Sequence, residues 1–183
     1  MQAVWSAARR ERLVTPQFAV EPLGQRHNRA AFSCGNEALD RYVKEQAGQD
    51  VRRRVARVFV AVGDDPTTIA GYYTLAATSI ARESLPEPAA RRLPRYPVPA
   101  AILGRLAVDV RFQHQGLGEH LVIDALARVL QASETVAVHA VVVDAKSPEL
   151  KAFYERLGFR GFPGNPLRLF LPLATIARAA AGT

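Results

Sequence analysis

Hydrophobic and polar positions follow two different periods along this chain, which predicts a mixture of strands and helices. Val55 to Val62 and Ile69 to Ile80 are rich in β-branched and aromatic residues, and the turn-forming residues Gly63 to Pro66 lie between them. This arrangement predicts an antiparallel hairpin. Ahead of the hairpin, Phe18 to Val20 predicts a short strand. Asn36 to Gly48 has apolar residues at helical spacing, with Asn36 as the N-cap.

The middle of the chain predicts a strand, a helix and a second strand in that order. Ile102 to Val110 is the first strand, and apolar residues then recur on one face of a helix from Leu117 to Leu130. Val136 to Val143 is almost continuously apolar, as expected of a strand covered on both faces. Ser84 to Pro99 combines prolines with arginines, which is typical of an ordered surface loop or a very short helix.

The last part of the chain predicts one more helix and one more strand. Ser147 and Pro148 suit the N-cap and first position of a helix, and Gly158 suits its left-handed end. Leu167 to Leu173 predicts a final strand. An antiparallel front half thus precedes a βαβα unit. We therefore expect an α/β fold whose mixed, mainly antiparallel central sheet carries helices on both faces.

Length and charge narrow the class of protein. The 183 residues suffice for one domain, which we place at 17–178, between a basic N-terminal arm at 1–16 and a tail at 179–183. A net charge of +7 favours polyanionic partners such as nucleic acid or phosphorylated cofactors. The single cysteine excludes a disulfide framework, and no long apolar run predicts a membrane span, so we expect a cytoplasmic protein. The four histidines show no paired ligand spacing, and we assign no metal.

A glycine-containing junction joins the strand at 102–110 to the helix that follows. Bare backbone at a helix start presents unpaired N–H groups to an anion, which makes a phosphate site. A dinucleotide-binding loop would need glycine where Leu121 stands, and a Walker A loop would need Gly-Lys-Ser or Gly-Lys-Thr. The pattern that remains is Gln113-x-x-Gly116-x-Gly118.

In this context the chain resembles the GNAT superfamily of acetyl-CoA-dependent N-acetyltransferases. The resemblance covers about residues 18 to 175 and rests on the order of Gly104 to Asp109, the glycine loop and Lys151 to Phe159. It implies a GNAT fold whose βαβα half binds acetyl-CoA, with Tyr154 as the acid that protonates the departing thiolate. Tyr154 also lies on the apolar stripe of its helix, so a core aromatic is the competing interpretation. The resemblance implies cofactor contacts from the strand residues Leu106, Ala107 and Val108 and from the loop residues Gln113, His114, Gln115, Gly116, Leu117 and Gly118.

Two positions depart from the family pattern. Many members have glycine where His114 stands, although histidine tolerates the left-handed region better than most residues. Members often carry a cofactor-contacting asparagine at the position of Ser147, to which we assign no such contact. Cys34 is interpreted as a small buried residue rather than a nucleophile.

Further segments resemble the GNAT toxins of bacterial toxin-antitoxin pairs, which acetylate the α-amino group of aminoacyl-tRNA and stop translation. They are Phe32 to Gly35, Gly71 to Leu75, Leu93 to Pro99, Val142 to Lys146 and Leu169 to Pro172. This resemblance implies aminoacyl-tRNA as substrate and a cognate antitoxin as partner, and a homodimer stays open. An α-amino group with a pKa of about 8 is partly neutral at pH 7, so it needs little help from a base. We find no carboxylate base in the strand Ile102 to Val108.

Basic residues gather in two clusters that suit RNA phosphates. From these clusters we assign five residues to nucleic-acid binding, namely Arg52, Arg53, Arg91, Arg92 and Arg95. The competing interpretation is a solvated strand face, with Arg52 to Arg57 pointing outward in alternation and Val51, Val55 and Val58 inward. Two other functions also stay open, namely a GNAT enzyme acting on a small amine or a protein N-terminus, and a non-enzymatic RNA-binding domain.

Overall fold

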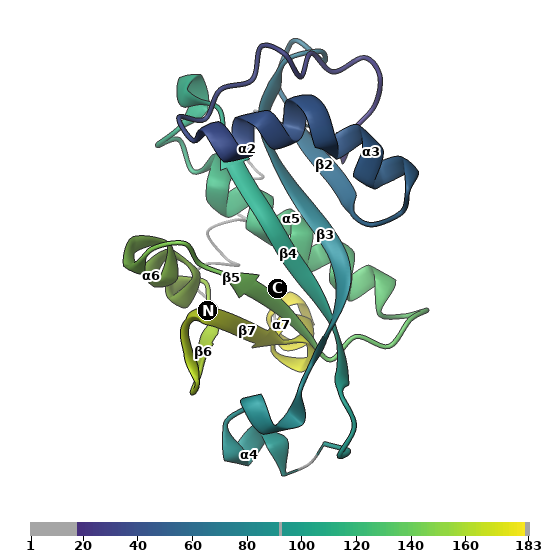
Figure 1. The fold of residues 1–183 in the computed structure, drawn as a ribbon, viewed down its shortest axis with the longest axis vertical. Helices are drawn as coiled ribbons and strands as arrows, with labels where there is room; N and C mark the ends of the chain where they lie inside the picture. The colour runs from purple at the N-terminus through teal and green to yellow at the C-terminus, as the bar shows by residue number, and fades with distance from the viewer. Residues whose placement is uncertain (1–17, 92, 182–183) are drawn as a thin grey trace. The chain divides into compact units, whose positions relative to one another are not determined.

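The computed structural model describes residues 18–91 and 93–181. Its elements follow the chain in the order β1 (Ala19–Pro22), α2 (Glu37–Arg41), η1 (Tyr42–Gln46), α3 (Ala47–Arg52), β2 (Arg57–Val62), β3 (Ile69–Ile80), η2 (Arg82–Ser84), α4 (Glu87–Ala90), β4 (Val98–Val108), η3 (Val110–Phe112), α5 (Leu117–Ala132), β5 (Ala140–Asp144), α6 (Pro148–Arg156), β6 (Arg160–Phe162), β7 (Asn165–Pro172) and α7 (Leu173–Ala181). The strands form a sheet of order β1-β2-β3-β4-β5-β7-β6 (Figure 1). The expected mixed, mainly antiparallel sheet is confirmed, since β4 and β5 are parallel and the pairs β1–β2, β2–β3, β5–β7 and β6–β7 are antiparallel.

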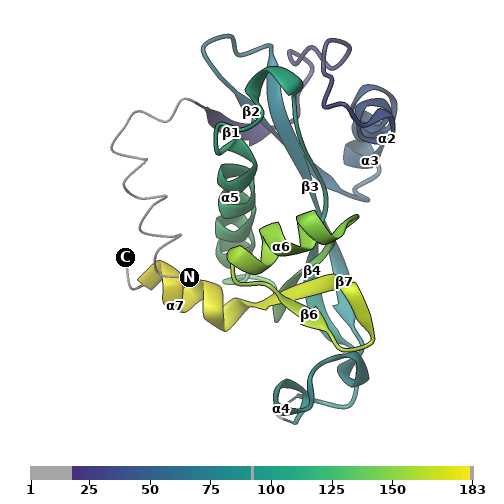
Figure 2. The ribbon, with the colours of Figure 1, turned by 90° about the vertical axis from the view of Figure 1, so that its left-hand side faces the viewer.

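The described chain divides into two compact units, and β3, β4 and α5 each run from one to the other. The N-terminal unit comprises residues 18–76 and 104–125, and the C-terminal unit comprises residues 77–103 and 126–181. The N-terminal unit contains the predicted hairpin, in which β2 and β3 pair antiparallel from Arg57 opposite Leu75 onward. Its strands have α2 and α3 on one face and the first turns of α5 on the other (Figure 2).

The core of the N-terminal unit joins the first helices to the hairpin. Tyr42 and Val43 of the π-helical segment η1 pack with Val58 and Val60 of β2 and with Tyr72 of β3. Asn36 caps α2, because its side-chain oxygen accepts from the backbone N–H groups of Ala38 and Leu39. The prediction of a helix for Asn36 to Gly48 is confirmed, but the observed helical stretch continues to Arg52 and includes a wider π turn.

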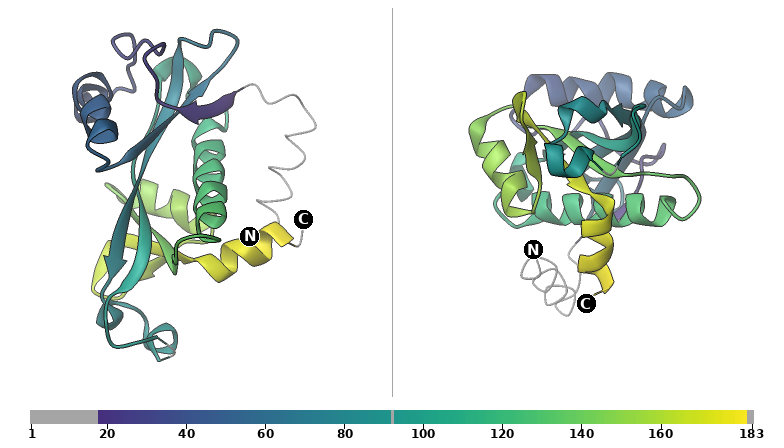
Figure 3. Two further views of the ribbon diagram at one scale, coloured as in Figure 1. Left: turned by 90° about the vertical axis from the view of Figure 1, so that its right-hand side faces the viewer. Right: turned by 90° about the horizontal axis from the view of Figure 1, so that it is seen from below.

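In the C-terminal unit, β5 is buried along its apolar length and pairs with Ala100 to Leu103 of β4 on one side and with β7 on the other. Helices α6 and α7 both contact β7, and α7 follows β7 directly (Figure 3). Phe162 and Phe170 pack tilted at 4.9 Å between ring centroids, in a cluster with Ile80, Leu85 and Val142.

Several predicted boundaries are wrong, and each error has a local cause. The strand predicted from Val136 begins only at Ala140, because a turn follows α5 and leaves Val136 65% exposed. Leu173, placed in the last strand, is the first residue of α7, whose course to Ala181 takes up most of the predicted tail at 179–183. The strand β6 and the helix α7 were not predicted. The proposed basic arm at 1–16 lies outside the described residues.

Candidate active site

The backbone after β4 carries a row of unused hydrogen-bond donors. From Gln113 through Glu119, no backbone N–H donates a hydrogen bond to any group in the described part of the chain. The first N–H with an acceptor is that of His120, which donates to the carbonyl of Gly116 at 3.1 Å. Since α5 begins at Leu117 and has 16 residues, these donors lie at the positive end of a long helix dipole. The row forms the kind of nest that binds a phosphate or diphosphate.

Two residues in this loop have left-handed backbone, which turns the chain sharply enough to line up the donors. His114 has φ of 61° and Gly116 has φ of 79°. The histidine that departs from the family pattern therefore takes the conformation that a glycine would take easily. A Cβ built on Gly116 meets no atom within 4 Å, so the space beside this glycine is open. The sequence argument that glycine leaves the backbone accessible here holds for Gly116.

Gln113 fastens the loop rather than presenting its side chain to a ligand. Its amide nitrogen donates at 3.0 Å to the carbonyl of Val108 at the end of β4 and at 3.0 Å to the carbonyl of Cys34. We predicted a cofactor contact for Gln113. Because its side-chain amide is already engaged in these hydrogen bonds, only its backbone N–H is available for such a contact. Leu117 is buried at 2% exposure, so it likewise offers a ligand only its backbone.

Asp109 anchors the start of the same loop from a buried position, at 1% exposure. Its carboxylate accepts from the backbone N–H of Ser33 at 3.1 Å, and from the backbone N–H and the Nε of Arg111 at 3.0 and 2.8 Å. Burial acts to raise the pKa of Asp109, but the hydrogen bonds from Arg111 and Ser33 outweigh it and hold the pKa below its usual value. Asp109 therefore holds the start of the loop that follows it. Its tie to Ser33 was not predicted, because the two residues stand 76 positions apart.

The strand residues before the loop lie against β3 at a point where no side chain fits. A Cβ on Gly71 would meet the carbonyl oxygen of Ala107 at 3.0 Å and the Leu121 side chain at 3.0 Å. Ala107 is buried, whereas Leu106 and Val108 are half-buried. Close packing of β3, β4 and α5 thus fixes the backbone of Leu106 to Val108 ahead of the row of donors.

Tyr154 lies in α6 of the C-terminal unit, and its environment differs from that of every other tyrosine. The chain has five tyrosines. The hydroxyls of Tyr42, Tyr72 and Tyr73 donate to Asp50, to the carbonyl of Leu39 and to Asp124. Tyr96 is 66% exposed.

The Tyr154 ring is buried and flanked by two aromatic rings, Phe153 at 5.2 Å and Phe159 at 5.5 Å between centroids. Its hydroxyl has no hydrogen-bond partner among the described residues, and no fully buried side-chain oxygen or nitrogen there lacks one. The hydroxyl therefore reaches the surface. Burial raises the pKa of Tyr154 to about 12, so the group carries its proton throughout the neutral range. A buried ring with an available, protonated hydroxyl fits a proton donor better than a purely structural aromatic.

A family model described as an acetyltransferase (GNAT) domain matches residues 54–161, which is more than half of the chain. The chain belongs to the GNAT acetyltransferase family. The matched span includes β4, the row of donors and Tyr154.

Two relatives of this GNAT protein match it over most of its length. A probable toxin TacT from Sinorhizobium fredii is 35% identical over 166 residues, which cover 86% of this chain and 92% of the relative. A tRNA-acetylating toxin from Mycobacterium tuberculosis is 38% identical over 152 residues, which cover 83% of this chain and 89% of the relative.

Solved structures agree with the fold of this GNAT protein. A tyrosine-to-phenylalanine mutant of KacT superposes with a TM-score of 0.84 at 32% identity, covering 89% of this chain and 99% of that one. AtaT complexed with acetyl-methionyl-tRNAfMet gives a TM-score of 0.83 at 31% identity, covering 88% and 98%. A tyrosine-to-phenylalanine mutant of AtaT bound to the C-terminus of the antitoxin AtaR and to acetyl-CoA gives 0.75 at 28%, covering 89% and 98%.

The residues of this GNAT protein fit acetyl-CoA chemically. The molecule carries a diphosphate, and the open space at Gly116 beside the row of free N–H groups suits that group. The diphosphate contact with the backbone of Gln113 to Gly118 and the pantetheine contact with Leu106, Ala107 and Val108 stay predictions. Among the described residues, no three histidine, cysteine, aspartate or glutamate side chains are arranged to hold a metal ion. No helix in that part of the chain is long and apolar enough to cross a membrane.

An aromatic and basic group lies next to the strand residues in the N-terminal unit. The Arg105 guanidinium lies 3.8 Å above the centre of the Tyr42 ring, and Tyr42 stacks on Tyr72 at 6.2 Å. Sequence reasoning missed this group, since only the fold brings η1 beside β4. Nearby, burial raises the pKa of the Cys34 thiol to about 11, with Asp40 acting in the same direction. Cys34 is therefore a protonated thiol at neutral pH, which fits the interpretation that it is not a nucleophile.

The two basic clusters differ from their predicted structure. Arg52 ends α3, Arg53 is its C-cap and Arg54 has φ of 58°, so these residues form a helix end and turn. The alternative of a strand face is wrong there, and Val55, expected to point inward, is 62% exposed. In the other cluster, Arg91 pairs with Glu87 at 2.8 Å, and Arg95 is exposed without an ion pair in the described part of the chain. Arg92 lies outside the described residues.

Proposed function

We propose that this protein transfers the acetyl group of acetyl-CoA to the α-amino group of aminoacyl-tRNA, and that it blocks translation as a toxin held in check by a cognate antitoxin. The use of acetyl-CoA as the acetyl donor rests on one observation. The seven backbone N–H groups from Gln113 to Glu119 have no acceptor among the described residues. The acceptor half is supported by the relative named a tRNA-acetylating toxin and by AtaT, solved with acetyl-methionyl-tRNAfMet. We further propose that the protein acts in the cytoplasm, where charged tRNA is used.

The proposed reaction is a direct transfer without an acyl-enzyme. Bound acetyl-CoA supplies an acetyl thioester. The neutral α-amine attacks its carbonyl carbon, so that a C–N bond forms as the C–S bond breaks. Tyr154 donates its hydroxyl proton to the departing thiolate, the amine loses a proton to solvent, and Tyr154 takes a proton back from solvent, so that the products are the amide and the free thiol. The available hydroxyl of Tyr154 and its pKa of about 12 support this role.

The acceptor class is supported by chemistry as well as by similarity. An α-amino group of pKa about 8 is partly neutral at pH 7, whereas a lysine amine of pKa about 10.4 is almost wholly charged. The part of β4 from Ile102 to Val108 carries no carboxylate that could act as a base. A strand without a base is sufficient for an amine that is already partly neutral at pH 7.

The deciding experiment is an acetyl-transfer assay on total charged tRNA. Purified protein, acetyl-CoA and charged tRNA should yield N-acetyl aminoacyl-tRNA, and mass spectrometry of the released amino acid identifies the acceptor. Deacylated tRNA, a lysine peptide and small amines serve as matched substrates. Transfer to a small amine or a peptide N-terminus, with none to charged tRNA, would replace the tRNA function with that alternative.

Calorimetry tests separately whether the protein binds acetyl-CoA, the proposed acetyl donor. Saturable binding is expected because of the free N–H row. Absence of binding, together with tight association with tRNA, would favour a non-enzymatic RNA-binding domain. Expression in a bacterial host should arrest translation, and undiminished protein synthesis in the presence of an active enzyme would contradict a toxin.

A further inference from the structure

Two arginine side chains of the N-terminal unit converge on one glycine. The position that a Cβ on Gly48 would occupy lies 2.9 Å from Nη1 of Arg29 and 3.5 Å from Nη1 of Arg52. The two nitrogens are therefore no further apart than the sum of these distances. Any larger residue at position 48 would push into the Arg29 guanidinium, so the glycine in α3 is what allows the two groups to approach.

The two guanidinium groups have no negative partner in the described part of the chain. Neither the Arg29 nor the Arg52 side chain forms an ion pair or hydrogen bond there. Arg26 and Arg41, by contrast, pair with Glu21 and Glu37. Asp50, on the same helix as Arg52, accepts the hydroxyl hydrogen of Tyr42. Like charges repel, so two guanidinium groups that approach the same glycine without a carboxylate beside them form a positive site that an anion would stabilise.

Both arginines are positioned by the fold itself. Arg29 lies in a loop held by buried His27, whose Nδ1 accepts from the N–H of Gly24 at 2.9 Å, and by buried Phe32. The N–H of Asn28 donates to the carbonyl of Thr67 at 2.8 Å, which ties the same loop to the hairpin. Arg52 occupies the last turn of α3. The backbone that carries each arginine is thus held in place, and only the ends of the two side chains have to adjust to a ligand.

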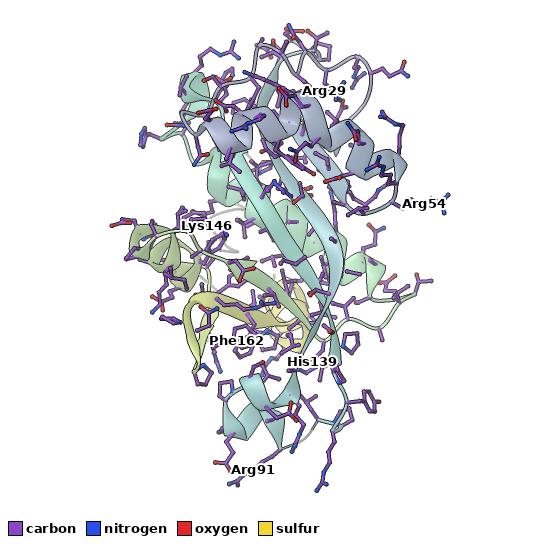
Figure 4. All side chains as sticks on the ribbon, viewed as in Figure 1. Arg29, Arg54, Arg91, His139, Lys146 and Phe162 are labelled. Carbon is purple, nitrogen blue, oxygen red and sulfur yellow. The ribbon has the colours of Figure 1, made fainter. Side chains whose placement is uncertain are left out.

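The geometry suits a phosphodiester. Its two non-bridging oxygens can each accept a charge-assisted hydrogen bond of about 2.8 Å, one from each guanidinium group. Arg53 and Arg54 extend the positive surface beyond the end of α3, and Figure 4 shows Arg29 beside the helical stretch and Arg54 past its end. A strand of RNA backbone presents phosphates in series to such a surface.

We propose that Arg29 and Arg52 clamp one backbone phosphate of the tRNA substrate, with Gly48 as the residue that lets them meet. This inference rests on the proposed function and adds to it the place where the RNA backbone is held. It assigns a role to Arg29, which the sequence clusters did not include, and a specific partner to Arg52. The clamp acts on affinity for tRNA and takes no part in binding acetyl-CoA.

The sharpest test is Gly48→Ala, which keeps every charge and changes only the fit. The added Cβ should displace the end of the flexible Arg29 side chain while leaving α3 intact, since alanine favours a helix over glycine. Gly48→Ala and Arg29→Gln should each raise the Kd for deacylated tRNA and the KM for charged tRNA on the order of tenfold. Arg29→Gln and Arg52→Gln should each reduce the slope of log K against log salt by about one. Arg178→Gln, on α7, is the matched loss of one exposed positive charge and should change the affinity much less.

The outcomes separate the clamp from the proposed function. Because binding is measured with deacylated tRNA, it does not depend on acetyl transfer. If Gly48→Ala and Arg29→Gln bind tRNA with the affinity and salt slope of the parent protein, the clamp is refuted even where charged tRNA is acetylated. If the variants lose tRNA affinity while the parent protein acetylates nothing on charged tRNA, the clamp stands and the proposed reaction fails. Unchanged melting temperatures and acetyl-CoA affinity in all variants complete the test.

Discussion

The side-chain amide of Gln113 donates a hydrogen bond to the carbonyl of Val108, which closes the loop that follows β4 onto the end of that strand. The same amide group holds the carbonyl of Cys34, which adds the segment before α2 to the closure. Three chain segments thus meet at one side-chain amide. The row of free N–H groups begins at the residue that makes this closure, which links the stability of the loop to its ability to bind an anion.

Gln113→Leu removes that closure at nearly constant side-chain volume. Two half-buried carbonyl oxygens lose their donor, at a cost of about 1–3 kcal/mol. We expect a lower melting temperature and an acetyl-CoA Kd raised about tenfold, measured by calorimetry. Gln131→Leu removes an exposed amide near the other end of α5 and is the control. Equal effects of the two substitutions would show that the hydrogen bonds of Gln113 do not organise the loop.

Asp109 should make the protein sensitive to acid. Its pKa is lowered in the folded state, because the hydrogen bonds from Arg111 and Ser33 outweigh its burial. A depressed carboxyl pKa gives stability that is fully present above the unfolded pKa of about 3.9 and is lost as the pH falls through the folded pKa. Urea unfolding of Asp109→Asn and the parent protein should therefore differ most near neutral pH and converge below about pH 4. A gap that is constant with pH would mean that the charge of Asp109 does not stabilise the fold.

Gly116→Ala tests the open space beside the row of donors. The positive φ of 79° costs an alanine about 1–2 kcal/mol, although its Cβ meets no protein atom. If a diphosphate occupies that space, the loss of acetyl-CoA affinity should exceed the loss of stability, reaching about tenfold or more. Gly161→Ala, also in open space but with no positive φ, should change neither. A variant that is less stable yet binds acetyl-CoA normally would remove Gly116 from the binding surface.

Tyr154→Phe tests the proposed acid. The ring and its contacts with Phe153 and Phe159 stay, so melting temperature and acetyl-CoA affinity should be retained. Loss of the proton donor should lower kcat by about 100-fold or more. In the parent protein kcat/KM should rise with pH toward the α-amine pKa of about 8 and show no decline from the tyrosine near neutrality, since the pKa of Tyr154 is about 12. Full activity of Tyr154→Phe would assign proton donation to another group.

The sequence determined the elements whose signals are local. The hairpin at β2 and β3, the strand-loop-helix through Gly116 and Gly118, and the Ser147-capped helix α6 all have the predicted order and type. Periodicity, caps and turn residues act within a few positions, so these elements can be predicted from one sequence.

Only the tertiary structure decided which partners these elements bring together. The tie between Ser33 and Asp109, the closure by Gln113, and the approach of Arg29 and Arg52 at Gly48 join residues from separate segments. It also decided that Arg52 to Arg54 end a helix and that Val136 is exposed. Such contacts depend on how distant parts of the chain pack, and local pattern carries no signal for them because many packings satisfy the same periodicity.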